Sequence, residues 1–181
     1  MENQIKRVKR TLKHQGVIVD FYSDTMQMPD GKLVEWDLIH HRKGAAAVVA
    51  VMDDGKLMMV RQYRNALDRM TLEIPAGARD SVEEDTKVCA ARELEEETGY
   101  HSDNLEFLIS LRTTVAFCDE FIDVYVARHL VKTNQHLDPD EYVELGTYDL
   151  DELVDKIYAG EIQDAKTVAA IMAYKNLTNI K

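Results

Sequence analysis

The sequence predicts an α+β fold or an α/β/α sandwich built on a mixed sheet, and three observations lead to this class. Short runs rich in β-branched and aromatic residues predominate, and turn residues such as Pro29-Asp30-Gly31 separate them. Helical patterns are few and do not alternate regularly with the strands. The 181 residues, 45% hydrophobic and 30% charged, are typical of one ordinary globular unit.

Two hairpins are expected first. The runs 16–28 and 32–41 flank the turn at 29–31, and the runs 45–52 and 56–64 flank Asp53-Asp54-Gly55. The run 45–52 is continuously apolar, which is typical of a strand covered on both faces, so the core sheet is expected here. The basic residues between Lys6 and Lys13 are interpreted as a solvated face.

The remaining elements follow in mixed order. A short strand is expected at 71–76, and a helix from Glu83 or Glu84 to Thr98, ended by Gly99. Strands are then expected at 105–115 and 121–130 and near 142–150. Helices near 150–158 and 164–177 complete the chain.

Composition excludes several classes of function. The net charge of -11 argues against a nucleic-acid-binding surface, and an anionic substrate would need a cation between it and the protein. The longest apolar run, 44–52, is too short to cross a membrane, and no secretion signal is recognised. Cys89 and Cys118 lack the spacing of a zinc site and are expected to be reduced thiols of a cytoplasmic protein.

The helix that ends at Thr98 carries a cluster of glutamates. With about 100° per residue and Glu93 at zero, Glu96 lies near -60° and Glu97 near +40°, so the three carboxylates share one face. Glu95 lies near 200° and points elsewhere. Arg92 precedes Glu96 by four residues and can orient its carboxylate. For a helix taken alone, a solvated acidic face is the simpler interpretation.

The block from Gly77 to Tyr100, GARDSVEEDTKVCAARELEEETGY, resembles the signature of the Nudix hydrolases, GX5EX7REUXEEXGU. Its second half matches at every position from Arg92 onwards. Six residues, not five, separate Gly77 from Glu84, so either Glu84 or Glu83 fills the early glutamate position.

The resemblance implies a Nudix fold over residues 44–181, with an N-terminal β-hairpin region at 1–43 that is exchanged between the subunits of a homodimer. It also implies a metal site. Glu93 and Glu97 would be the principal ligands of Mg²⁺, or of Mn²⁺, with Glu96 and the carbonyl of Ala76 close by. Hard oxygen ligands suit Mg²⁺, which also bridges to substrate phosphates.

Similarity to the ADP-ribose pyrophosphatase branch implies further roles. Glu120, in the segment TTVAFCDEFIDVYV, would be the general base, although Thr114-Val115-Ala116 replaces that branch's Ser-Pro-Gly. A polar turn is the alternative for this position. Arg64 would contact the substrate and Glu73 would lie just behind it, with a surface cation and a strand-end carboxylate as alternatives. Trp36 would stack on a nucleobase or, alternatively, lie in a core or interface.

The expected catalytic residues are therefore Glu97, Glu120 and Arg92, and the expected reaction is Mg²⁺-dependent hydrolysis of ADP-ribose or a similar nucleoside diphosphate sugar to a nucleoside monophosphate and a sugar phosphate. Neither nucleic acid nor membrane is an expected partner. Two alternatives stay open. The chain could hydrolyse another nucleotide such as GDP-mannose, or it could be a non-catalytic nucleotide-sensing module.

Overall fold

The computed structural model describes residues 4–137, 139 and 141–179, and the chain divides into two compact units. The smaller unit contains the residues up to Gly44 together with Arg112–Phe121. The larger unit contains Ala45–Leu111 and the residues from Ile122 onwards. The division into an N-terminal β-hairpin region at 1–43 and a Nudix domain at 44–181 stays a prediction.

The smaller unit is an antiparallel sheet in the order β1-β2-β3, formed by β1 (Lys6–Gln15), β2 (Val19–Gln27) and β3 (Leu33–His41). The predicted hairpin is confirmed as β2 and β3. The strand β1 was not predicted, because its many charged residues interrupt the apolar pattern of a strand. Most of β1 is exposed, and Arg10 donates two hydrogen bonds of 2.7 Å to the carboxylate of Asp24, its partner on β2.

The segment Arg112–Phe121 belongs to this smaller unit because it bonds to the end of β3. The N–H of Ile39 donates to the carbonyl of Phe117 at 2.7 Å, and the N–H of Asp119 donates to the carbonyl of Ile39 at 3.2 Å. The strand predicted at 105–115 therefore ends earlier, at Arg112, where the chain turns into this loop.

The larger unit is built on a mixed sheet, as predicted. The strand order is β12-β5-β4-β10-β9, with β10 parallel to β4 and β5 antiparallel to it. The strands are β4 (Ala45–Val51), β5 (Leu57–Arg64), β9 (Asn104–Arg112), β10 (Phe121–Arg128) and β12 (Val143–Tyr148). The strand expected at 71–76 is two strands, β6 (Arg69–Glu73) beside β5 and β7 (Ala76–Ala78) beside β4. The short strands β8 (Tyr100–His101) and β11 (Val131–Lys132) pair separately.

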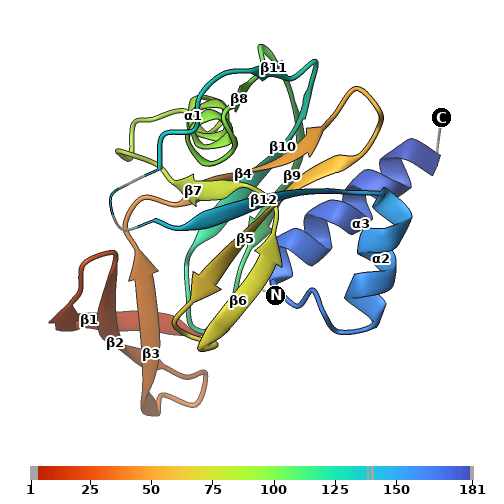
Figure 1. Ribbon diagram of the computed structural model, residues 1–181. Helices are drawn as coiled ribbons and strands as arrows, with labels where there is room; N and C mark the ends of the chain where they lie inside the picture. The colour runs from red at the N-terminus through yellow and green to blue at the C-terminus, as the bar shows by residue number, and fades with distance from the viewer. Residues whose placement is uncertain (1–3, 138, 140, 180–181) are drawn as a thin grey trace. The chain divides into compact units, whose positions relative to one another are not determined.

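Helices cover both faces of this sheet (Figure 1). Alternate residues of β4 point to opposite sides, so Ala47 and Val49 belong to one apolar cluster and Val48 and Ala50 to the other. The α1 helix (Thr86–Thr98) packs into the second cluster through Leu94. The first cluster is closed by α2 (Leu150–Tyr158) and α3 (Ala165–Asn179). The predicted strand buried on both faces and the predicted α/β/α layers are thus confirmed.

Candidate metal and phosphate site

The glutamate helix begins two or three residues later than predicted. The carboxylate of Asp85 accepts a hydrogen bond of 2.8 Å from the N–H of Lys87 and caps the helix, whose first residue is Thr86. Glu83 and Glu84 therefore lie in the turn before the helix, so the extra residue in the motif lengthens that turn and leaves the helical spacing intact.

Arg92 holds several of the motif carboxylates together. Its Nη1 donates to Glu93 at 2.7 Å and to Glu96 at 2.8 Å, which confirms the predicted pair four residues apart. Its Nε donates to Glu84 at 3.2 Å, and its Nη2 donates to the carbonyl of Ala78 at 3.0 Å. Glu84, and not the exposed Glu83, therefore occupies the early motif position beside the helix. These contacts give Arg92 an orienting role.

Two carboxylates of the helix are buried. Glu93 is 8% exposed and Glu97 is 2% exposed, so these two carboxylates do not form a solvated acidic face. Burial raises the pKa of Glu93 to about 7 in spite of the neighbouring Arg92, and raises the pKa of Glu97 to about 8 in spite of a hydrogen bond from the N–H of Ala76. These two neighbouring carboxylates are buried, so a cation bound to both would stabilise their charged forms.

Gly77 lies directly against one of these carboxylates. A Cβ at this position would be 2.1 Å from Cδ of Glu93 and 2.2 Å from each of its oxygens. The space that a side chain would fill is therefore occupied by the Glu93 carboxylate, which explains in physical terms why the motif begins with glycine.

The donor set fits a hard divalent cation, because these carboxylates and the nearby backbone of β7 offer oxygen ligands only. Among the described residues, however, no three His, Cys, Asp or Glu side chains are already gathered as a metal cluster. Glu93 and Glu96 face Arg92 instead. Glu95 points away from them, as predicted, and lies 3.3 Å from His101.

A loop after β11 closes over the end of α1. The helix ends at Gly99, whose φ of 68° is left-handed, and the carbonyl of Gly99 accepts from the N–H of Thr133 at 2.8 Å. The free carbonyl of Glu96 accepts from the N–H of His136 at 2.9 Å. These bonds satisfy carbonyls that a helix end leaves open, and they fix the loop beside the carboxylates.

This loop leads to a carboxylate that was not predicted from the sequence. Glu141 follows the loop, and its negative charge raises the pKa of both Glu93 and Glu97. The only sequence signal was the short acidic run at 138–141, which has no helical or motif spacing to Glu97. Glu141 is thus a further carboxylate within electrostatic reach of the glutamate helix in the same unit.

The predicted substrate residues Arg64 and Glu73 meet in the larger unit. The Nε and Nη2 of Arg64 donate to the two oxygens of Glu73 at 2.8 and 2.7 Å. Glu73 is 1% exposed, so its carboxylate is a buried anchor for the arginine and not a surface group. The charge of Glu97 also raises the pKa of Arg64, which places the pair within electrostatic reach of the glutamate helix.

The remaining predicted residues, Glu120 and Trp36, belong to the smaller unit. Oε1 of Glu120 lies 3.7 Å from Nε2 of His41. Trp36 is 48% exposed and lines a pocket of about 370 Å³ with Glu35, Asp37, Ala116 and Phe117. The interpretation of Trp36 as a core residue of the chain is therefore wrong. Its role at an interface or against a base stays a prediction, as does the role of Glu120.

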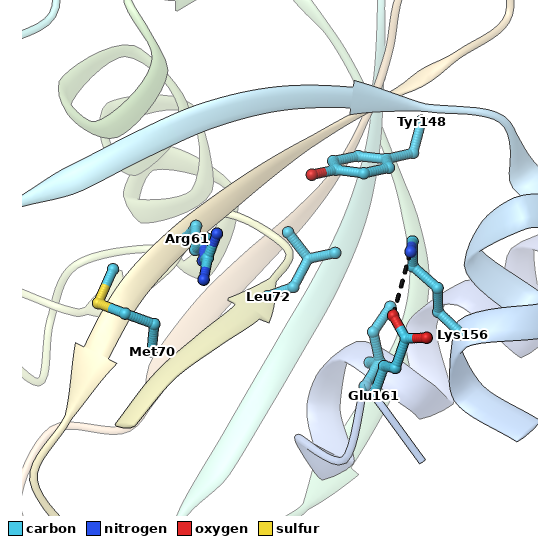
Figure 2. Close-up of a pocket in the computed structure, with 7 residues that line it drawn as sticks. Arg61, Met70, Leu72, Tyr148, Lys156 and Glu161 are labelled. Carbon is cyan, nitrogen blue, oxygen red and sulfur yellow. Dashed lines mark hydrogen bonds and ion pairs between the residues drawn. The ribbon is translucent and has the colours of Figure 1, made fainter. Parts of the chain in front are cut away.

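A second pocket lies in the larger unit, with a volume of about 250 Å³ (Figure 2). Arg61 and Leu72 line it from the strands, and Lys156 of α2 lies opposite them and is held by Glu161 at 3.1 Å. Arg61 follows Met59 on the sheet face covered by α2 and α3, so this pocket lies on the other face from α1. It contains none of the predicted site residues.

Residues 41–171 match the family described as NUDIX domain, which covers more than half of the chain. The chain therefore belongs to the Nudix family. It is 40% identical over 168 residues to a methanol dehydrogenase activator of Bacillus methanolicus, covering 92% of this chain and 90% of that protein. It is 37% identical over 168 residues to an ADP-ribose pyrophosphatase of Bacillus subtilis (strain 168), with the same two coverages.

A solved structure, described as the crystal structure of ADP compounds hydrolase, superposes with a TM-score of 0.88. The two chains share 19% sequence identity, and the match covers 98% of this chain and 95% of that one. The fold is thus the Nudix fold. Within the described residues, no helix is both long and apolar enough to cross a membrane.

Proposed function

We propose that the protein hydrolyses the diphosphate bond of ADP-ribose or a similar nucleoside diphosphate sugar, giving a nucleoside monophosphate and a sugar phosphate. The observation that carries the proposal is the pair of buried carboxylates on the Nudix helix, Glu93 and Glu97. The Glu93 carboxylate lies against Gly77, and the Glu97 carboxylate accepts a hydrogen bond from the N–H of Ala76. The similarity to an ADP-ribose pyrophosphatase over 92% of the chain supports the substrate class.

Glu93, Glu96 and Glu97, with the carbonyl of Ala76, would hold Mg²⁺ or Mn²⁺. When bound, the cation supplies neutralisation of the diphosphate and a more acidic water. Arg92 orients Glu93 and Glu96. Ionisation of buried carboxylates becomes favourable once a cation neutralises them, so their raised pKa values agree with this role.

Two carboxylates compete for the role of general base. Glu120 is the residue that the resemblance to the ADP-ribose pyrophosphatase branch predicts, and Glu141 is the one whose charge raises the pKa of Glu93 and Glu97. Glu120→Gln and Glu141→Gln separate them, because removal of a base should lower kcat about 100-fold or more while metal affinity persists. The residue whose variant retains the wild-type kcat is not the general base.

The test of activity is a panel of ADP-ribose, GDP-mannose, UDP-glucose and NADH with Mg²⁺, with products separated by chromatography. Glu97→Gln should abolish turnover. Glu95→Gln is the matched control, because Glu95 lies on the same helix and contacts His101 on another face. Preferential cleavage of GDP-mannose would identify that sugar nucleotide as the substrate. Full activity in Glu97→Gln would overturn the metal assignment.

A second candidate function is activation of a methanol dehydrogenase, which the 40% identity to such an activator supports. Purified dehydrogenase should then turn over faster when this protein is added. If Glu97→Gln also activates the dehydrogenase, activation does not need hydrolysis and the protein acts by binding. If only the wild type activates it, activation depends on the site.

The oligomeric state is proposed to be a homodimer that exchanges residues 1–43, in a cytoplasmic protein with free Cys89 and Cys118. Trp36, exposed on the smaller unit, would then be covered by the partner or by a base. Light scattering should give twice the mass of one chain, and removal of residues 1–43 should give monomers. A monomeric full-length protein would contradict the proposal.

A further inference from the structure

The carboxylate of Glu73 is surrounded by hydrogen-bond donors. Besides the two bonds from Arg64, the hydroxyl of Thr71 donates to Oε1 at 2.6 Å, and Nζ of Lys166 donates to Oε2. Both oxygens are thus held by two donors each. A carboxylate bound in this way has one orientation, and it fixes the plane of the guanidinium that pairs with it.

Lys166 comes from a distant part of the chain and is itself held in place. It lies in the first turn of α3, its side chain is 10% exposed, and Nζ also donates to Asp164 at 2.9 Å. Asp164 accepts from the N–H and hydroxyl of Thr167, and that hydroxyl accepts from the N–H of Ile74 at 3.1 Å. The start of α3 is therefore tied to the residue after Glu73.

This position is unfavourable for a lysine that has no function. A cation near the N-terminus of a helix opposes the helix dipole, and burial of an ammonium group costs free energy that pairing only partly offsets. An apolar residue at position 166 would avoid both costs, but it would remove one charge partner from the buried Glu73 carboxylate. The role of this charge is therefore to be sought in Glu73 and in the group that Glu73 holds.

Arg64 shows what that role can be. Its Nε and Nη2 are bound to Glu73, and in the part of the chain that the structure describes its Nη1 meets no acceptor. The Arg64 side chain is 41% exposed. The charge of Glu97 raises the pKa of Arg64, and the charge of Lys166 lowers the pKa of Glu97. The three groups therefore lie within electrostatic reach of one another.

We propose that Lys166 is a positioning residue that holds Glu73 so that the free Nη1 edge of Arg64 faces the anionic diphosphate of the substrate. This inference rests on the proposed function, because it assigns Arg64 as the group that would bind the diphosphate at that site, the phosphate clamp. Lys166 acts through Glu73 and Arg64 and needs no contact with the substrate. Its removal leaves Oε2 of Glu73 with one donor instead of two, so the carboxylate and the plane of the Arg64 guanidinium are held less firmly.

The test is a set of KM and kcat values for ADP-ribose in Lys166→Met, Lys166→Arg, Arg64→Gln and the double variant Arg64→Gln/Lys166→Met. Lys166→Met should raise KM about tenfold, the effect of one weakened charged hydrogen bond, with kcat within about threefold. Lys166→Arg should restore most of the affinity. In the Arg64→Gln background, Lys166→Met should raise KM no further, since its target is already gone.

Thermal unfolding identifies any variant that does not fold. If Lys166→Met does not fold, the KM of Lys166→Arg is compared with that of the wild type instead. An unchanged KM in folded Lys166→Met, or effects on KM that multiply in the double variant, would overturn the positioning role while the activity stands. If the wild type neither cleaves nor binds any member of the panel, the proposed function fails first, and the phosphate clamp fails with it.

Discussion

Gly77→Ala is expected to damage the site without damaging the fold. The added Cβ would lie 2.1 Å from Cδ of Glu93, and ordinary contacts begin near 3.4 Å, so the carboxylate would have to withdraw by about 1.3 Å, the difference between the two. Gly77 does not have a positive φ, so alanine is compatible with its backbone. A misplacement of about 1 Å in a catalytic arrangement costs roughly 100-fold in rate, which sets the expected fall in kcat.

The assay combines kcat for ADP-ribose, Mn²⁺ affinity by calorimetry and the free energy of unfolding in urea. Gly77→Ala should lose activity and metal affinity, with a loss of stability of roughly 1–3 kcal/mol from overpacking. Gly55→Ala is the control, because Gly55 has a φ of 86° in a turn with open space around it, so only stability should fall. If Gly77→Ala had the kcat and Mn²⁺ affinity of the wild type, the position of the Glu93 carboxylate against residue 77 would not be needed for activity or metal binding.

Three further predictions follow from buried charges and thiols. Burial would raise the pKa of Glu73, but the bonds from Arg64 and Lys166 lower it to about 2. Ionised Glu73 therefore stabilises the fold by about 3 kcal/mol above pH 4.5, and this stabilisation is lost as the pH falls from 4.5 to 2. Urea unfolding at several pH values should show this slope in the wild type and a flatter one in Glu73→Gln; equal slopes would contradict it. Arg64→Gln should raise KM for ADP-ribose about tenfold, whereas Arg61→Gln, on the same strand but the opposite face, should not, and equal effects would point to general charge loss. Burial raises the pKa of Cys89 to about 12, so iodoacetamide followed by mass spectrometry should label it only after unfolding, and rapid labelling of the native protein would show that this helix opens.

The glutamate face was predictable because it depends on local geometry. Residues three and four apart meet on any α-helix, so Glu93, Glu96 and Glu97 could be placed together, and Arg92 beside Glu96, before the structure was known. The buried strand β4 was predictable for a similar reason, since a continuous apolar run is stable only between two covered faces.

Elements whose character depends on partners were predicted less well. The charged strand β1 has no apolar alternation, and it is a strand because Arg10 and its neighbours pair with β2. The start of α1 was misplaced because Glu83 and Glu84 favour a helix locally, while the cap of Asp85 ends the preceding turn.

The sequence by itself therefore determined the family, the layers and the glutamate face of the helix, because each follows from short-range periodicity and motif spacing. Only the tertiary structure decided how deeply Glu93 and Glu97 are buried, that Gly77 lies against Glu93, and that Glu141 comes within electrostatic reach of the same helix. It alone joined Lys166 to Glu73, 93 positions apart in the chain. Such contacts form when the sheet and its helices pack together, and no local pattern in the sequence records them.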